Sequence, residues 1–412
     1  MGKCCANTGA RVDTCDPCSP PEVCTAAKAA DVSGTPLEWF ENMVDNCLDF
    51  AEEAGRQGKP VVGIMCEYAP RELIMAAGAL PACLCGGSAK TIPAAEEHLP
   101  ANLCPLIKST YGYSVTGANP FLEAASLVVA ETTCDGKKKM FELMSDHRPV
   151  YVMELPHKQG DPDAFEHWVR EVGKLKTEME ARLGVEITDE RLREAIGLMN
   201  RERALRRELA SFMRADPPPI TGRQLLDFKS IISCIPADLD QYRRAVEMLT
   251  GGWTSGDYSD RVRVLLTGVP VVHGAERVVD IIEDSGGVVV CMENCTGLKP
   301  ILEDVDELAP DPIRALAAKY FDIHCAVMTR NDRRMRVLGE LAREYRAQCV
   351  IDLVWQACTT YDIESYQVRL LAERDLGLPY MRIETDYSPS DSARIAVRVE
   401  ALYETVRGGI AR

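Results

Sequence analysis

The sequence predicts an α/β protein with two parallel-sheet domains, a leading helical segment and a helical insert. Its 412 residues are too many for one ordinary core and suggest two or three domains. Short apolar runs that alternate with helical patterns occur twice, in residues 61–155 and 262–383, and a long, charged, helically periodic stretch separates them. Because strands that alternate with helices form parallel sheets, each region should fold as a Rossmann- or flavodoxin-like unit.

The composition narrows the class of protein. Hydrophobic residues at 46% and charged residues at 27% are ordinary for a soluble globular protein. The net charge of -16 argues against a nucleic-acid partner, because neutralising phosphates needs basic clusters. No apolar run approaches the roughly 18 to 20 residues that cross a bilayer, and the N-terminus lacks the core of a signal peptide. We therefore expect a cytoplasmic protein without a membrane partner.

The 17 cysteines are the unusual feature of the composition. In a reducing compartment such a number points to metal or redox chemistry rather than to disulfides. Residues 1–35 lack apolar periodicity, so this segment is expected to be a flexible arm or to be ordered only by a metal. The cysteines of this arm are Cys4, Cys5, Cys15, Cys18 and Cys24.

The first α/β domain, with its leading helix, is expected over residues 36–158. Buried-type apolar runs predict its strands, and Pro70 and Gly78 are typical of a helix start and a helix stop. The expected strands are residues 61–65, 80–84, 124–130 and 150–155. The expected helices are residues 39–55 and 71–77, one from about residue 103 towards Tyr113, and one that includes residues 141–144.

The helical insert is expected over residues 159–258. Thr188 followed by two acidic residues predicts a helix start, and three prolines at residues 217–219 break the helical pattern. We expect this insert to contribute core packing and little chemistry. Its expected helices are residues 163–183, 188–214, 222–235 and 238–249.

The second α/β domain is expected over residues 259–412, where the pattern of the first domain returns. Its expected strands are residues 262–267, 286–291, 349–354 and 378–383. Its expected helices are residues 275–284, 312–321, 332–345 and 392–407.

Cysteines lie at the ends of the expected elements in both domains. Cys66, Cys85 and Cys134 each follow a strand and Cys104 precedes a helix, so a parallel sheet would bring these four to one rim. In the second domain Cys295 and Cys358 follow strands, and Cys325 lies in a loop. The remaining cysteines fall inside strand or helix patterns and are expected to be small buried hydrophobes. These are Cys47, Cys83, Cys234, Cys291 and Cys349.

Widely spaced thiolates of this kind do not fit a zinc ribbon or a single ferredoxin-like run. They fit an iron–sulfur cluster held between the two domains, where each domain supplies an incomplete set of three cysteines. A cluster with an open coordination position can bind a substrate or an inorganic bridge. A zinc-stabilised structural protein fits the strand-end placement less well.

Several short segments resemble, in order, the 2-hydroxyacyl-CoA dehydratase and benzoyl-CoA reductase superfamily, and within it they look most like the double-cubane cluster proteins. The likeness runs from about residue 36 to the C-terminus. The segments are residues 66–73 (CEYAPREL), 84–87 (LCGG), 103–108 (LCPLIK), 131–140 (ETTCDGKKKM), 293–297 (ENCTG), 325–329 (CAVMT) and 384–388 (ETDYS).

This resemblance implies an oxygen-sensitive homodimer that carries, in each subunit, two [4Fe-4S] cubanes joined by a bridging sulfide, an [8Fe-9S] cluster. It also implies an ATP-hydrolysing iron–sulfur activator, itself a [4Fe-4S] protein, that donates low-potential electrons for the reduction of a small molecule. Carried over motif by motif, the resemblance assigns three cysteines to each cubane, with Cys85 as the alternative to Cys66. The first cubane would use Cys66, Cys104 and Cys134, and the second Cys295, Cys325 and Cys358.

Charged residues near these cysteines are candidates for supporting roles. Glu67, Glu131 and Glu293 each lie within three residues of a proposed ligand and could relay protons, or could equally be capping or bridging carboxylates. Lys137 and Lys138 could bind the cofactor by offsetting its charge, or could be solvated. The loop histidines His98 and His273 are weaker candidates for proton transfer.

Two other functions remain open at this point. The chain could be a subunit of a 2-hydroxyacyl-CoA dehydratase or a benzoyl-CoA-type reductase, which the resemblance implies would hold a single [4Fe-4S] cluster. Six cluster-grade cysteines and the lack of a clear basic pocket for CoA speak against this. The chain could also be a non-catalytic iron–sulfur electron carrier, with every cluster position closed by the protein.

Overall fold

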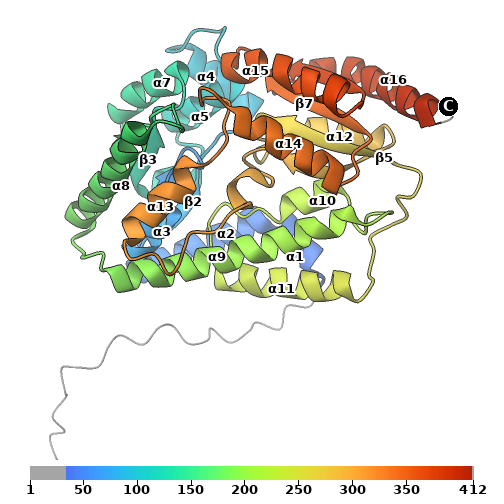
Figure 1. The fold of residues 1–412 in the computed structure, drawn as a ribbon. Helices are drawn as coiled ribbons and strands as arrows, with labels where there is room; N and C mark the ends of the chain where they lie inside the picture. The colour runs from blue at the N-terminus through green and yellow to red at the C-terminus, as the bar shows by residue number, and fades with distance from the viewer. Residues whose placement is uncertain (1–33, 411–412) are drawn as a thin grey trace, which may run out of the picture. The chain divides into compact units, whose positions relative to one another are not determined.

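The computed structural model describes residues 34–410 and contains two four-stranded parallel sheets (Figure 1). The strand order is β2-β1-β3-β4 in the first sheet and β6-β5-β7-β8 in the second, so the two sheets have the same topology. Every strand pair in both sheets is parallel. The predicted α/β class with two parallel-sheet units is therefore confirmed.

The first sheet and its helices lie between residues 36 and 153. Most strand residues are buried, as expected for a parallel sheet that is covered on both faces. The strands are β1 (Val61–Ile64), β2 (Leu80–Cys83), β3 (Ala125–Glu131) and β4 (Val150–Met153). The helices are α1 (Pro36–Glu41), α2 (Met43–Arg56), α3 (Arg71–Ala76), η1 (Ala89–Thr91), α4 (Ile92–Glu96), α5 (Pro105–Thr116), α6 (Pro120–Ala124) and α7 (Asp135–Ser145).

The second sheet and its helices lie between residues 262 and 410. Strands β5, β6 and β7 are buried along their whole length, which matches their continuous apolar runs. The strands are β5 (Val262–Gly268), β6 (Gly287–Glu293), β7 (Cys349–Trp355) and β8 (Tyr380–Thr385). The helices are α12 (Arg277–Asp284), η3 (Lys299–Ile301), α13 (Pro312–Phe321), α14 (Asp332–Glu344), α15 (Thr359–Leu370), η4 (Leu371–Asp375), η5 (Pro389–Asp391) and α16 (Ser392–Ile410).

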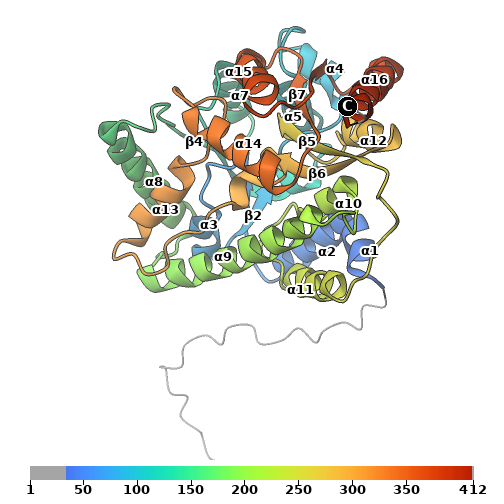
Figure 2. The same cartoon turned by 45° about the vertical axis from the view of Figure 1, so that its right-hand side comes forward.

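Helices connect the two sheets. Thr188 caps the start of α9 by accepting a hydrogen bond from the Arg191 amide, as its position before two acidic residues predicts. Figures 1 and 2 show α9 and α11 side by side, next to α1 and α2, in the lower part of both views. The connecting helices are α8 (Pro162–Leu183), α9 (Asp189–Ser211), η2 (Phe212–Arg214), α10 (Gly222–Asp227) and α11 (Pro236–Thr250).

The prediction of a helix over residues 222–235 is wrong for the second half of this range. Helix α10 ends at Asp227, and the segment after it runs beside the edge of the first sheet. The Cys83 amide donates to the Ile231 carbonyl at 2.9 Å, and Ala82 forms an antiparallel bridge with Ile232. Pairing with an exposed sheet edge outweighs the helical pattern of this segment.

Other differences from the expected elements are smaller. Helix α15 was not expected, because its β-branched and aromatic residues are weak helix formers. Its buried residues Tyr361, Ser365 and Val368 nevertheless follow helical spacing. Helix α7 begins at Asp135 rather than near Phe141, so the lysine run lies within the helix. The single leading helix is two helices, and the short α4 and α6 were also not expected.

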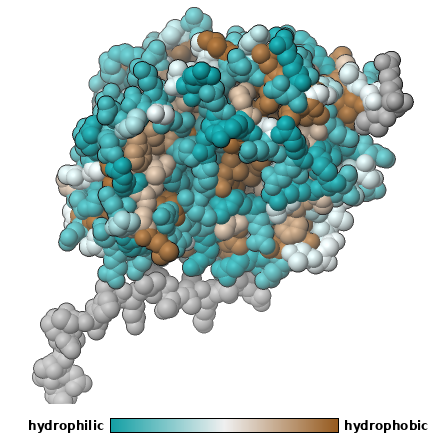
Figure 3. Space-filling view, viewed as in Figure 1, coloured by the Kyte–Doolittle hydropathy of each residue, from teal (hydrophilic) through white to brown (hydrophobic). Residues whose placement is uncertain are grey.

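The predicted division into three domains over residues 36–158, 159–258 and 259–412 stays a prediction. The expected cysteine-rich arm falls almost wholly on residues 1–33, outside the described part of the chain. Within residues 34–410, none of the helices is both long enough and apolar enough to cross a membrane. The face seen in Figure 3 is mostly hydrophilic, with apolar residues in small patches.

A buried carboxyl joins the leading helix to the connecting helices. Asp238, at the start of α11, accepts a hydrogen bond from Trp39 Nε1 at 2.9 Å and another from the Ser230 hydroxyl. Burial raises the pKa of Asp238 to about 6, against the opposing effect of these two donors, and the nearby carboxylate of Glu202 adds to the rise. The folded protein therefore holds a proton at this site more tightly than the unfolded chain does.

We predict that Asp238 makes the protein less stable as the pH rises. Because its pKa is raised on folding, its contribution to the free energy of unfolding is complete below about pH 4. That contribution, up to about 3 kcal/mol, is lost as the pH rises past about 6. Asp238→Asn should remove this part of the pH dependence in urea unfolding at pH 5 and pH 7. Asp240→Asn, an exposed position on the same helix, should leave the dependence as in the wild type, and an equal effect of both variants would contradict the prediction.

Candidate metal centre

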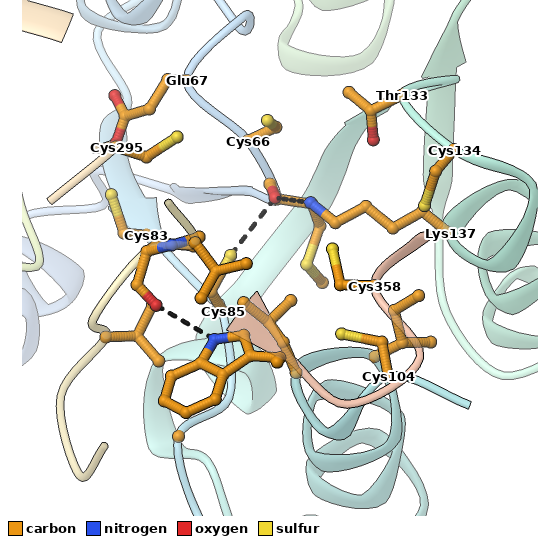
Figure 4. Close-up of a pocket in the computed structure, with 18 of the residues that line it drawn as sticks. Cys66, Glu67, Cys83, Cys85, Cys104, Thr133, Cys134, Lys137, Cys295 and Cys358 are labelled. Carbon is orange, nitrogen blue, oxygen red and sulfur yellow. Dashed lines mark hydrogen bonds between the residues drawn. The ribbon is translucent and has the colours of Figure 1, made fainter. Parts of the chain in front are cut away.

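A cavity of about 890 Å³ lies where the carboxyl ends of strands from both sheets come together. The loops that follow β1, β2, β3, β6 and β7 all contribute to its wall. The crevice beyond the strand ends is the usual ligand site of open parallel sheets. Of the twelve cysteines that the structure describes, all of them free, eight line this cavity. They are Cys66, Cys83, Cys85, Cys104, Cys134, Cys295, Cys325 and Cys358. Figure 4 labels all of these except Cys325.

The cavity therefore brings together all six cysteines proposed as ligands and the alternative Cys85. Cys47, Cys234, Cys291 and Cys349 are buried elsewhere, as expected. The expectation that Cys83 belongs to the core was wrong. Cys83 is only partly buried, lines the cavity, and accepts a hydrogen bond from Arg71 Nη2 at 3.4 Å.

Three of the cavity thiols lie at helix N-termini, and we call them the N-cap group. Cys104, Cys134 and Cys358 are the N-cap residues of α5, α7 and α15. The first turn of a helix offers free backbone N–H groups, which favour a thiolate. The neighbouring Cys358 thiol lowers the pKa of Cys104, as do the amides of Ile107 and Leu106, while burial opposes the shift.

A second set, which we call the loop group, consists of Cys66, Cys295 and Cys325. Cys66 follows β1, Cys295 follows β6, and Cys325 lies between α13 and α14. Burial raises the pKa of Cys66 well above its usual value, and the negative charges of Cys295 and Cys325 add to the rise. Burial likewise raises the pKa of Cys295 to about 12, again with a contribution from Cys325. These three thiols are therefore electrostatic neighbours.

Each of the two groups mixes the first and second halves of the chain. Cys104 and Cys134 come from the first half and Cys358 from the second, whereas Cys66 comes from the first half and Cys295 and Cys325 from the second. In the view of Figure 4 the N-cap group lies to the right and Cys295 to the left. The division that the resemblance implies, with Cys66, Cys104 and Cys134 in one set and Cys295, Cys325 and Cys358 in the other, stays a prediction.

Lys137 places a positive charge among these thiols. Its side chain is partly buried in the cavity wall, and Nζ donates to the Met65 carbonyl at 2.8 Å, along a dashed line in Figure 4. Burial alone would lower the pKa of Lys137, but the neighbouring Cys66, Cys85 and Cys134 raise it, so the ammonium stays charged. Lys138 also lines the cavity, but its side chain is 44% exposed and pairs with Asp135 at 2.8 Å on the helix surface.

The three candidate glutamates lie in different surroundings. Glu67 lines the cavity, and although burial raises its pKa, ion pairs with Arg71 and Lys229, each at 2.7 Å, hold it well below the usual range. Glu293 is buried outside the lining, where Lys299 and Arg334 outweigh burial and hold its pKa below the usual range. Two of the three are thus poorer proton acceptors than an ordinary glutamate.

Glu131 is the exception among the three. It is fully buried at the end of β3, outside the cavity lining, and neither carboxyl oxygen has a side-chain partner. Burial raises its pKa to about 8, against the opposing charges of Lys137 and Arg71. The relay role expected for all three glutamates stays a prediction.

The two loop histidines also differ. His98 lies outside the cavity lining, and its Nδ1 is 3.0 Å from the Tyr111 hydroxyl. His273 lines the cavity, and its Nε2 is 3.0 Å from the Lys229 carbonyl. A proton-transfer role for either histidine stays a prediction.

Sequence reasoning missed the contribution of the connecting helices to the cavity. Leu226, Lys229, Ser230 and Ile231 line it, although this segment was expected to do little chemistry. A lone lysine in a predicted helix gives no signal that it reaches two distant loops.

The two halves of the chain meet tightly beside the cavity. A Cβ atom on Gly87 would lie 2.2 Å from the His273 carbonyl oxygen, so only glycine allows this approach. The Tyr387 hydroxyl donates to the Gly86 carbonyl at 3.1 Å, and the Tyr68 hydroxyl donates to the Ile323 carbonyl at 2.9 Å. These contacts fix the two sets of cysteine loops relative to each other.

The donors surround the cavity rather than a single point. Within the described residues, no three His, Cys, Asp or Glu side chains form a group that could hold one metal ion. An iron–sulfur cluster binds its protein thiolates at separate irons, so its ligands need not meet at one point. A wall of thiols, some at helix N-termini and some beside the partly buried Lys137, has the chemistry of iron–sulfur ligation.

Comparison with known proteins gives consistent matches over most of the chain. Residues 66–406 match the family described as 2-hydroxyglutaryl-CoA dehydratase, D-component. YjiM of Escherichia coli (strain K12), described as a proposed dehydratase subunit, is 41% identical over 358 residues, which cover 84% of this chain and 92% of the relative. The beta subunit of lactoyl-CoA dehydratase from Anaerotignum propionicum is 25% identical, with 84% of this chain and 92% of the relative covered. A benzoyl-CoA reductase subunit from Thauera aromatica is 21% identical, with 86% and 93% covered.

We predict that Gly87→Ala weakens the contact between the halves. The added methyl group has no room beside the His273 carbonyl, so the free energy of unfolding should fall by about 1–3 kcal/mol. Gly160→Ala, where an added Cβ would meet nothing within 4 Å, should change it by less than about 0.5 kcal/mol. Chemical denaturation of both variants measures the difference, and equal stability would contradict the tight contact.

Proposed function

The chain belongs to the 2-hydroxyglutaryl-CoA dehydratase D-component family, and on that premise we propose that it is an iron–sulfur reductase that reduces a small molecule with low-potential electrons. The observation that carries this proposal is the convergence of eight free thiols from both sheets on one cavity. Relatives of the chain are named as dehydratase and reductase subunits, which supports a catalytic role. We also propose that the protein is oxygen-sensitive and works in the cytoplasm.

We assign two cubanes, bridged by sulfide as [8Fe-9S], to the two groups of thiols. The N-cap group of Cys104, Cys134 and Cys358 would hold one cubane, and the loop group of Cys66, Cys295 and Cys325 the other. Cys85 also lines the cavity and remains the alternative to Cys66. This division follows the thiol neighbour that acts most strongly on each cysteine, which is Cys358 for Cys134 and Cys104, and Cys295 for Cys66, although Cys325 also acts on Cys134. It uses the same six cysteines that the sequence resemblance implies.

When bound, such a cluster would supply electrons at low potential to a substrate in the cavity. The protein's own residues would prepare the site for it. Backbone amides at three helix N-termini act to lower the pKa of the N-cap group, but burial still raises the pKa of Cys134, and Cys104 and burial raise that of Cys358. The Lys137 ammonium lies close to Cys66, Cys85 and Cys134 and opposes such a rise. Lys138, which is half exposed and paired with Asp135, would contribute less.

The proposed partners are a second copy of this chain and an ATP-hydrolysing [4Fe-4S] activator protein. Relatives named as subunits support the presence of a partner component. The substrate would be a small molecule.

A second candidate is a subunit of a 2-hydroxyacyl-CoA dehydratase or a benzoyl-CoA-type reductase with a single [4Fe-4S] cluster. The names of the relatives favour it, since they refer to lactoyl-CoA and benzoyl-CoA. Eight cavity thiols, more than one cubane needs, favour the double cubane instead. A non-catalytic electron carrier would bind iron but would reduce no candidate substrate.

Iron and acid-labile sulfide in the anaerobically purified protein separate these proposals. We expect about eight iron atoms per chain, together with an electron paramagnetic resonance signal after reduction. About four iron atoms would favour the single-cubane alternative, and acyl-CoA thioesters would then be the substrates to test. Zinc without iron would overturn the cluster proposal.

Substitution of a cluster ligand should reduce the iron content, whereas substitution of a buried cysteine outside the cavity should not. Cys295→Ala should remove about half of the iron while the circular dichroism spectrum stays that of the wild type. Cys349→Ala, at a buried thiol outside the cavity, should keep the full iron content. Unchanged iron in the Cys295 variant would sink its assignment as a ligand.

The charge of Lys137 should set the reduction potential. Removing a partly buried positive charge beside thiolates disfavours the more negative reduced state, so Lys137→Met should lower the potential by tens of millivolts, on the order of 1 kcal/mol. Lys139→Met, at an exposed lysine paired with Glu142, should leave the potential unchanged. A redox titration followed by paramagnetic resonance makes the comparison, and equal potentials would exclude this role for Lys137.

A further inference from the structure

Lys229 lies on a segment that is fixed to the edge of the first sheet. After α10 ends, the chain pairs with β2 through the Ile231 carbonyl and the bridge between Ala82 and Ile232. The Ile231 amide also points to Met43 Sδ at 3.4 Å. The backbone that carries Lys229 is therefore held in place by contacts on both sides of the segment.

The Lys229 side chain connects the two halves of the cavity wall. Its Nζ donates to Glu67 Oε1 at 2.7 Å and to the Cys295 carbonyl at 2.7 Å, and only 12% of the side chain is exposed. Glu67 follows Cys66 directly in the sequence. One ammonium thus ties the Cys66 loop of the first half to the Cys295 loop of the second, and hydrogen bonds of this kind are strong because the donor is charged.

The Lys229 main chain makes a third connection. Its carbonyl oxygen is 3.0 Å from His273 Nε2, and His273 belongs to the loop after β5. The carbonyl of His273 in turn packs against Gly87, the site of close approach between the halves. Side chain and main chain of one residue therefore contact three loops that line the cavity.

We propose that Lys229 is a positioning residue that sets the separation of Cys66 and Cys295 within the loop group. This proposal depends on the proposed function in one respect, namely that Cys66 and Cys295 bind a cluster. Without the ammonium, Glu67 keeps Arg71 as its one ion-pair partner within residues 34–410, and the Cys295 carbonyl loses a charged donor. Both loops would then be free to move apart.

The test compares Lys229→Met with the wild type in two states. In the metal-free chain, hydrogen exchange of peptides that cover residues 60–72 and 290–300 should be about tenfold faster in the variant, because both loops lose a common anchor. In the anaerobic iron-loaded chain, iron content should fall by about half, and the paramagnetic resonance spectrum of the reduced sample should change. Lys229→Arg, which keeps the charge and the donors, should restore both readouts in large part.

A matched control is Lys176→Met. Lys176 also forms a 2.6 Å ion pair with a glutamate, Glu180, but it lies on α8 and does not line the cavity. This variant should leave exchange, iron and spectrum as in the wild type. If Lys229→Met does not fold, Lys229→Gln keeps a shorter donor and is measured in the same way.

The outcomes separate this inference from the proposed function. Wild-type protein without iron would overturn the cluster proposal, while the exchange experiment would still decide whether Lys229 anchors the two loops. Unchanged exchange in the variant would overturn the anchor. Faster exchange with unchanged iron and an unchanged spectrum would show that Lys229 stabilises the fold but does not position the thiols.

Discussion

Positive charge inside the cavity wall is the condition on which the candidate site depends. Burial raises the pKa of Cys66 and Cys295, so thiolates at these positions need compensating charge. Near Cys66 this charge comes from Lys137, whose ammonium is held by the Met65 carbonyl. Near Cys295 it comes mainly from Lys299, which is paired with Glu293, and Lys229, held by Glu67, adds a smaller part. An unpaired ammonium in such a place would be costly, so each lysine is fixed by an oxygen of the protein. The wall combines thiols, cations and oxygen acceptors in one connected arrangement.

The identical strand order of the two sheets explains how the thiols come together. A cavity cysteine follows β2 and β3 in the first sheet and β6 and β7 in the second. Because the strands of each sheet are parallel, the ends that carry these cysteines lie on one side of the sheet. Cys85 after β2 thus occupies the place of Cys295 after β6, and Cys134 after β3 that of Cys358 after β7. Cys66 after β1 has no cysteine counterpart after β5, where Val269 and Pro270 line the cavity.

Features that depend on neighbouring residues in the sequence could be predicted, whereas features that depend on contacts between distant residues could not. The strand-end positions of Cys66, Cys134 and Cys358 could be predicted, because apolar runs and the residues that follow them are adjacent in sequence. The partners of those thiols could not, since Cys104 meets Cys358 across more than half the chain. The same limit applies to Lys229, whose segment has a helical pattern but pairs with a sheet edge. Cys83 was misplaced because alternation along β2 does not show that a cavity opens beside it.

The mixing of halves in each thiol group has a consequence for how the protein is made. A growing chain that has passed only the first sheet carries two members of the N-cap group, Cys104 and Cys134, and one of the loop group, Cys66. Neither group is complete until Cys358 and Cys325 have been synthesised and the second sheet has folded against the first. Loading of iron would therefore be a late event in biogenesis, and a truncated product would lack the means to capture and retain a full cofactor.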